Sequence, residues 1–291
     1  MKKLYGTGVA LVTPFTEALR IDYKSLKKIL SHTAKGVDYY VVMGTTGEAA
    51  TLTDGEKKEV LQFVKDNNPK GLPIVYGIGG NNTQHILDTI ADTDFKGVDA
   101  VLSVSPYYSK PSQEGIYQHF KVIADACPVP IILYNVPART ASNLTAETTI
   151  RLAGHKNIIG IKEASGNLEQ CMKIVHQAPK EFLMISGDDM LTIALYSFGG
   201  RGVISVLANA FPTVFRKMKD HAFDGSFGKA SQEQFKILDI NGPMYEEANP
   251  VGVKFVMSLM GLCDPFVRLP LVPASFALQK KIEKLYSEMK K

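Results

Sequence analysis

Short apolar runs alternate along the chain with longer stretches in which apolar residues recur every three or four positions. The short runs are rich in β-branched residues, which is typical of strands, whereas the spacing of the longer stretches is typical of helices. Eight short runs lie at residues 8–13, 38–43, 73–78, 100–104, 130–134, 158–162, 182–185 and 202–206. Strands that alternate with helices predict parallel βαβ units, so the chain is expected to be an α/β protein with a (β/α)8 TIM barrel.

Helix start signals support this division. Asp22, Ser112 and Thr145 each precede a helical stretch, and residues 53–56 (Thr-Asp-Gly-Glu) have the composition of a capping box. Residues 165–167 (Ser-Gly-Asn) predict one more helix start. The first strand is not followed by the glycine fingerprint of dinucleotide-binding folds, which argues against a doubly wound sheet.

The pattern changes after the eighth strand. From about residue 211 onward we find only helical patterns, at 214–221, 229–240, 253–260 and 275–290. The sequence therefore predicts a barrel domain at residues 1–224 and a C-terminal helical domain at residues 225–291.

Composition excludes several classes of protein. The 291 residues are 45% hydrophobic, and a net charge of +4 without a basic block gives no sign of nucleic-acid binding. The three cysteines are widely spaced and predict neither a disulfide framework nor a zinc site. Without a signal-peptide pattern or an apolar run of membrane-spanning length, we expect a cytoplasmic protein with no membrane partner.

The sixth predicted strand ends in a single lysine. Because side chains alternate along a strand, Ile158, Gly160 and Lys162 share one face. If that face lines the barrel, the Lys162 amine is shielded from water, and an uncharged amine can attack a carbonyl carbon. A lone lysine at the end of a strand can equally be a surface residue that opens a loop. The catalytic interpretation therefore depends on whether neighbouring strands bring matching chemistry to the same place.

Neighbouring strand ends supply matching chemistry. By the same alternation Tyr134, at the end of the fifth strand, points the same way as Lys162. Arg139 follows with a planar cation suited to a carboxylate, although a surface ion pair is the simpler reading. After the second strand, Thr45 and Thr46 lie between glycines, where hydroxyls and backbone amides can approach an anion or simply cap a turn.

Two further strand ends add weaker signals. Tyr107 and Tyr108 follow the fourth strand, and adjacent tyrosines serve more often in packing or interfaces than in acid–base chemistry. The seventh strand ends with Gly187, a candidate substrate-binding residue, before Asp188 and Asp189. We interpret these carboxylates as caps of a helix beginning at residue 190, because no third ligand shows metal-binding spacing.

Together these residues predict a Schiff-base lyase or aldolase acting on a 2-oxo acid. An imine between lysine and the keto acid withdraws electrons, so the adjacent methyl group loses a proton and becomes an enamine that attacks an aldehyde. A phenol beside hydroxyls can relay the protons. The non-catalytic alternative is a barrel that only binds a keto acid.

The three motifs at residues 44–48, 134–140 and 160–165 also resemble the dihydrodipicolinate synthase and N-acetylneuraminate lyase family of class I aldolases. The resemblance implies a pyruvate Schiff base on Lys162, with no other cofactor and no metal, and Tyr134 as proton donor and acceptor. It further implies a proton relay through Thr45 to Tyr108, the latter from a neighbouring subunit of a homotetramer.

The resemblance also implies how the substrates are held. Thr46 would bind the pyruvate carboxylate, the backbone carbonyl of Ile204 would border the pyruvate, and Arg139 would bind the carboxylate of L-aspartate 4-semialdehyde. Family members that act on sialic acid or 2-keto-3-deoxy sugar acids generally lack this arginine, and they are the alternative function.

Response to lysine is a separate expectation. In relatives inhibited by lysine, a glutamate four residues after an asparagine binds the effector. Here the fourth residue after Asn81 is His85, and the helix after the second strand offers Asp54 and Lys57. A cation is unfavourable where the ligand ammonium needs a carboxylate. We therefore predict weak or absent inhibition by lysine.

Overall fold

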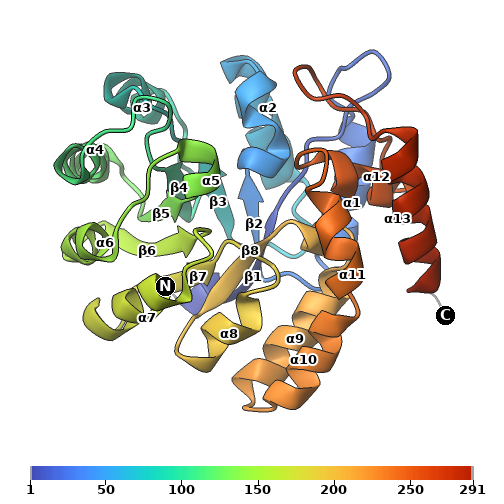
Figure 1. Cartoon of the computed structure of the whole chain (residues 1–291). Helices are drawn as coiled ribbons and strands as arrows, with labels where there is room; N and C mark the ends of the chain where they lie inside the picture. Colours follow the sequence, from blue (N-terminus) through green and yellow to red (C-terminus); the bar gives the residue numbers. More distant parts are fainter. Residues whose placement is uncertain (1, 290–291) are drawn as a thin grey trace. The chain divides into compact units, whose positions relative to one another are not determined.

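The computed structural model of the chain describes residues 2–289. Its eight strands form a closed parallel barrel in chain order, which confirms the α/β (β/α)8 architecture. The strands are β1 Gly6–Ala10, β2 Tyr39–Val42, β3 Ile74–Gly77, β4 Ala100–Val104, β5 Ile131–Asn135, β6 Ile158–Glu163, β7 Leu183–Ser186 and β8 Gly202–Ser205 (Figure 1).

The strands are apolar because they are buried on both faces, as parallel strands usually are. Every residue of β1, β2, β5, β7 and β8 is buried. Seven predicted ranges agree with the structure to within one residue at each end. The first range, 8–13, was wrong: β1 begins two residues earlier, at Gly6, and ends three residues earlier, at Ala10. Beyond its end, the Leu11 N–H still donates to the Val41 carbonyl of β2 at 3.0 Å.

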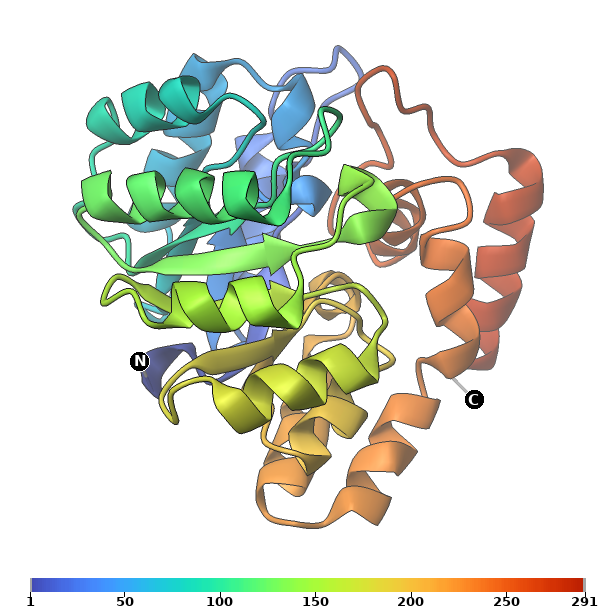
Figure 2. The ribbon, with the colours of Figure 1, turned by 60° about the vertical axis from the view of Figure 1, so that its left-hand side comes forward.

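The chain comprises two compact units. The first contains residues 73–204 and the N-terminal segment up to Tyr5. Its helices are η1 Lys2–Leu4, α3 Thr83–Ala91, α4 Gln113–Ala126, α5 Pro137–Thr140, α6 Ala146–Ala153, α7 Leu168–Gln177 and α8 Thr192–Ser197. Within this unit α6 packs between α4 and α7 (Figure 2).

The second unit contains residues 6–72 and the chain from Ser205 onward. Its α-helices are α1 Tyr23–Thr33, α2 Asp54–Asp66, α9 Pro212–Phe223, α10 Phe227–Phe235, α11 Leu238–Asn241, α12 Val251–Leu259 and α13 Phe276–Glu288. Its 3-10 turns are η2 Thr45–Gly47, η3 Ala49–Thr51, η4 Leu207–Asn209 and η5 Gly242–Met244. Within residues 206–289 the structure has helices and turns but no strand, as predicted.

One helix of the C-terminal region differs from its prediction. The single helix expected at 229–240 is two helices, because α10 ends at Phe235 and α11 begins at Leu238. Ile237 and Ile240 are fully buried at this break, so tertiary packing overrides a continuous helical pattern. The domain boundary at 224/225 stays a prediction; it falls in the connection between α9 and α10.

The predicted helix starts are confirmed at four positions. Asp22, Ser112 and Thr145 each accept a backbone N–H in the first turn of the helix that follows. Thr53 and Glu56 form the expected capping box at the start of α2. For the remaining start predicted at 165–167, the residue that caps the helix is Asn167.

The caps expected from Asp188 and Asp189 were wrong. Helix α8 begins at Thr192 rather than at residue 190, and its first turn has no side-chain cap. The Asp188 carboxylate instead accepts the N–H of Met190 at 2.8 Å, which closes a turn before the helix.

Candidate active site

Lys162 and Tyr134 lie side by side on adjacent strands of the first unit. They are paired in the register of β5 and β6. The Lys162 Nζ lies 4.2 Å from the centre of the Tyr134 ring, and the two residues are only 6% and 7% exposed. The structure therefore brings together the amine and the phenol that the sequence placed on one face.

Gly160, two residues before Lys162, lets β7 lie close against β6. A Cβ at Gly160 would lie 2.6 Å from the Leu183 Cβ and 2.7 Å from the Leu183 carbonyl oxygen on β7. These distances are shorter than real Cβ contacts, so the neighbouring strand can approach only a glycine here. The lysine is thus carried by a strand that fits tightly against its neighbour, and such fixed elements hold a reactive group precisely.

A buried carboxylate follows the lysine on the same strand. Glu163 is 3% exposed and accepts hydrogen bonds from the Asn135 Nδ2 (3.0 and 3.1 Å), the Gln170 Nε2 (2.8 Å) and the Ser165 N–H (2.7 Å). Asn143 extends the network by donating to the Gln170 Oε1 at 2.8 Å. These bonds satisfy the carboxylate without a counter-ion, as buried polar groups require.

The network fixes the ends of the two strands that carry the reactive pair. Asn135 follows Tyr134 on β5, and Glu163 follows Lys162 on β6. A hydrogen bond between Asn135 and Glu163 therefore locks the strand ends in register. The sequence interpretation missed these residues because an isolated Glu and Asn give no signal until the fold pairs them.

Tyr107 and Tyr108 lie on the surface of the first unit, 40% and 87% exposed. Tyr108 has a φ of 72°, which is uncommon for a residue with a side chain and often marks a functional position. The Asn81 Nδ2 donates to the Tyr107 carbonyl at 3.3 Å, which supports this turn. The phenol of Tyr108 is therefore presented to solvent or to another molecule.

Other predicted substrate-binding residues of this unit lie at strand ends. Arg139 is exposed on the short helix α5 that follows β5. Ile204 is buried on β8. Gly187 follows β7, donates its N–H to the Glu163 carbonyl at 2.7 Å, and has no room for a Cβ, which would lie 2.6 Å from that of Ala164.

The turn that carries the Thr45 and Thr46 hydroxyls belongs to the second unit. Thr45 and Thr46 are in η2, directly after β2 and the buried Met43. Thr46 is buried and its Oγ1 accepts a hydrogen bond from the Asn249 Nδ2 at 3.0 Å, whereas Thr45 is exposed. The Thr13 Oγ1 donates to the Gly47 carbonyl at 2.7 Å and fixes the other end of the turn.

Glu48, the last residue of this motif, is part of a second buried polar cluster. Its carboxylate forms an ion pair with Lys254 of α12, and both side chains are at most 1% exposed. It also accepts the backbone N–H of Arg268 at 3.0 Å. The sequence interpretation used only the glycines and hydroxyls of this motif and missed the ion pair, whose partners are 206 residues apart.

Residues 2–289 contain no group of three or more His, Cys, Asp or Glu side chains arranged to hold a metal ion. The three cysteines are buried and unpaired. Burial, helped by the charge of Glu163, raises the pKa of Cys171 to about 12, and burial also raises the pKa of Cys127. None of the helices within residues 2–289 combines the length and the apolar character of a membrane span.

The residues considered for lysine response are at the surface. Lys57 forms an ion pair with Asp54 at 2.9 Å within α2, and His85 is exposed in the first turn of α3. Weak or absent inhibition by lysine stays a prediction.

Comparison with known proteins gives one consistent result. The sequence profile of the dihydrodipicolinate synthetase family matches residues 3–289. A protein of Cytophaga hutchinsonii named 4-hydroxy-tetrahydrodipicolinate synthase is 50% identical over 287 residues, 98% of this chain and 97% of its own. A protein of the same name from Flavobacterium psychrophilum is 46% identical over the full length of both chains. Among solved structures, the chloride-inhibited dihydrodipicolinate synthase of Acinetobacter baumannii in complex with pyruvate superposes with a TM-score of 0.95 at 36% identity, covering 99% of each chain.

Proposed function

The chain belongs to the dihydrodipicolinate synthetase family, and we infer that it catalyses the reaction for which its relatives are named. This reaction condenses pyruvate with L-aspartate 4-semialdehyde to 4-hydroxy-tetrahydrodipicolinate, the first committed step of lysine biosynthesis through diaminopimelate. The chain is thus a Schiff-base lyase. The observation that carries the inference is the buried pair of Lys162 and Tyr134, matched in register on adjacent strands.

We propose that Lys162 forms the covalent intermediate. Its uncharged Nζ attacks C2 of pyruvate, and loss of water from the carbinolamine gives an iminium ion. The positive nitrogen lets C3 lose a proton, and the resulting enamine attacks the aldehyde carbon of the second substrate. The amino group of that substrate then displaces Lys162 from C2, which closes the ring and frees the enzyme. The protein needs no other cofactor for these steps.

Tyr134 is suited to move the protons. The Lys162 Nζ lies 4.2 Å from the centre of its ring, and we assign to its phenol the protons that move when water is lost and when C3 is deprotonated. Thr45 and Tyr108 continue the relay in this proposal. Tyr108 then acts from a neighbouring subunit, in agreement with its exposure in a single chain.

Four further residues bind the substrates in this proposal. Thr46 holds the pyruvate carboxylate: its oxygen accepts from Asn249, so its own hydrogen is left to donate to an anion. The Ile204 carbonyl and Gly187 border the substrates, and Arg139 binds the carboxylate of the semialdehyde through its planar fork.

Assembly and location complete the proposal. The protein is a homotetramer formed by two dimers in the cytoplasm, and Tyr108 crosses the dimer interface. Light scattering coupled to size-exclusion chromatography measures the mass directly. A Tyr108→Phe variant is expected to keep that mass but to lose turnover, and a fully active monomer would contradict the assignment of Tyr108.

A turnover assay tests the function. Pyruvate plus L-aspartate 4-semialdehyde is compared with cleavage of sialic acid and of a 2-keto-3-deoxy sugar acid under the same conditions. The inference requires turnover with the semialdehyde, at a rate at least about a hundredfold above cleavage of either sugar acid. A site built to bind the carboxylate of the semialdehyde strongly rejects partners that lack this group. Faster cleavage of either sugar acid would refute it.

A further inference from the structure

The turn that carries Thr45 and Thr46 is held in an unfavourable backbone conformation at both ends. Met43 precedes the turn with a φ of 63°, and Glu48 follows it with a φ of 53°. Both residues have side chains, and the left-handed region disfavours them. Such a conformation persists only where the surroundings fix it, so contacts outside the turn determine its shape.

The contacts on Glu48 come from the C-terminal region of the chain. Lys254 of α12 pairs with one carboxylate oxygen, and the Arg268 N–H donates to the other at 3.0 Å. Lys254 also donates to the Phe266 carbonyl at 2.9 Å, and its Nζ lies 4.2 Å from the centre of the Phe15 ring. Desolvation by burial lowers the pKa of Lys254, whereas the adjacent carboxylate of Glu48 favours the charged form.

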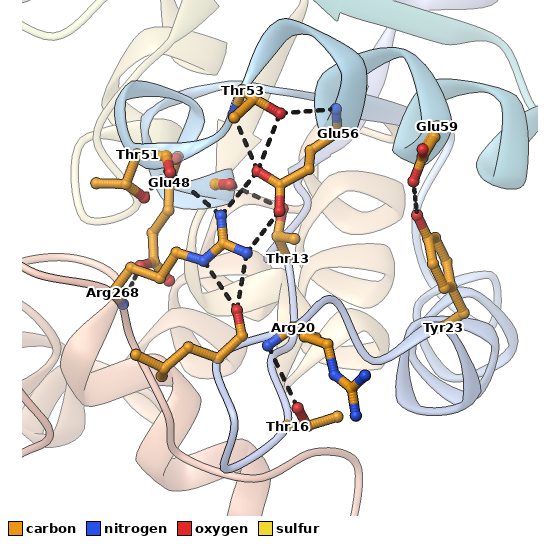
Figure 3. Close-up of polar contacts among 12 residues, drawn as sticks. Thr13, Thr16, Arg20, Tyr23, Glu48, Thr51, Thr53, Glu56, Glu59 and Arg268 are labelled. Atoms are coloured by element: carbon orange, nitrogen blue, oxygen red, sulfur yellow. Dashed lines mark hydrogen bonds and ion pairs between the residues drawn. The ribbon is translucent and has the colours of Figure 1, made fainter.

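Arg268 also holds the chain that follows the turn, through Thr51 and Glu56 (Figure 3). Its guanidinium makes two bonds to the Glu56 carboxylate of α2, at 2.6 and 2.8 Å. It also donates to the carbonyl of Thr51 (3.2 Å) and to that of Leu19 (3.0 and 2.7 Å). A planar, bidentate contact of this kind fixes geometry as well as supplying attraction.

We propose that Lys254 and Arg268 are positioning residues for the reaction: they hold residues 43–51 in the shape that presents the Thr45 and Thr46 hydroxyls to the pyruvate carboxylate. This proposal rests on the role inferred above for the two threonines. Neither cation needs to touch a substrate. Their effect is on pyruvate binding rather than on the semialdehyde, because the carboxylate of the semialdehyde is assigned to Arg139.

If Lys254 and Arg268 only stabilised the fold, replacing them would change the free energy of unfolding but not the affinity of the folded protein for pyruvate. A buried ion pair is weak evidence for stability, since replacing both partners by apolar residues is often neutral or stabilising. A double variant, Glu48→Met with Lys254→Met, should therefore still fold, although its urea midpoint should fall because the Arg268 N–H and the Phe266 carbonyl each lose a partner. It lacks every side-chain bond that holds Glu48, so its pyruvate saturation, measured without urea on the folded protein, tests positioning apart from stability.

The experiment compares four proteins: the wild type, the double variant, Arg268→Lys, and Lys281→Met as a matched control. Lys281→Met breaks an exposed ion pair with Glu246 in the same C-terminal region. For each protein we would measure the urea midpoint, the pyruvate concentration that gives half-maximal borohydride trapping, and the KM for the semialdehyde.

The double variant is expected to fold with a lower urea midpoint than the wild type. In the folded protein it should need about tenfold more pyruvate, the effect of weakening one hydrogen bond to a charged group. Arg268→Lys keeps the charge but not the fork, so a rise of about threefold is expected. The KM for the semialdehyde should change in neither variant, and the control should match the wild type.

Wild-type pyruvate saturation in the double variant would overturn the proposal while leaving the proposed function intact. If the double variant does not fold, Arg268→Lys decides: a raised pyruvate requirement at an unchanged urea midpoint supports positioning, and wild-type saturation overturns it. If the wild type itself forms no pyruvate adduct, the proposed function fails and this inference fails with it.

Discussion

Replacing Glu163 by glutamine removes one acceptor from the buried network beside Lys162. In the wild type one carboxylate oxygen accepts from Ser165 N–H and the other from Gln170 Nε2. Whichever way the new amide turns, its NH₂ group faces one of these donors. One buried donor is thus left without a partner, which costs about 1–3 kcal/mol of the free energy of unfolding.

The same substitution should slow catalysis. Glu163 joins Asn135 across the ends of β6 and β5, one residue beyond Lys162 and Tyr134. A small shift of that pair affects the rate strongly, since misplacing reacting groups by about 1 Å can cost about a hundredfold. We expect kcat to fall by about tenfold or more in the fraction that is folded.

Urea unfolding followed by circular dichroism measures the loss of stability, and steady-state kinetics measures kcat. Glu169→Gln is the control, because the Glu169 side chain is 73% exposed and pairs with Lys173 on the surface of α7. It should change the free energy of unfolding by less than about 0.5 kcal/mol. If Glu163→Gln resembles this control in both measurements, the assigned role of the network is wrong.

Three further predictions follow from buried positions. Gly160→Ala should lower the free energy of unfolding by about 1–3 kcal/mol, since its Cβ would collide with Leu183, and a melting temperature equal to that of wild type would contradict this. Burial lowers the pKa of His119 to about 4, so the unfolded chain binds a proton that the native protein does not between roughly pH 6.5 and 4. Stability should therefore fall as pH falls through that range, by roughly 2–3 kcal/mol more than in His119→Phe; identical pH profiles would refute it. The buried thiols of Cys127 and Cys171, whose pKa values are raised, should resist iodoacetamide at pH 8 in the native protein and react in urea, as counted by mass spectrometry.

The fold was predictable from local pattern. Parallel barrel strands are buried on both faces, so they are recognisable as apolar runs, and helix starts such as Asp22 and Thr53 have local signals. The pairing of Tyr134 with Lys162 was also predictable, because alternation along each strand fixes the face.

What local pattern did not reveal depends on partners distant in sequence. Glu48 meets Lys254, 206 residues away, only because the fold brings α12 to η2, and Glu163 meets Asn135, 28 residues away, only because β5 and β6 pair. The break at Ile237 likewise reflects burial rather than a helix-breaking residue. Such contacts are tertiary, so no window of the sequence contains them.

The most direct test of the central assignment is to trap the intermediate. The protein is incubated with pyruvate, reduced with borohydride, digested and mapped by mass spectrometry, with Lys162→Ala and the exposed-site variant Lys281→Met treated in parallel. The account predicts one reduced pyruvate adduct, on the peptide containing Lys162, in the wild type and in Lys281→Met, and none in Lys162→Ala. An adduct that persists in Lys162→Ala, or no adduct in the wild type, would contradict it.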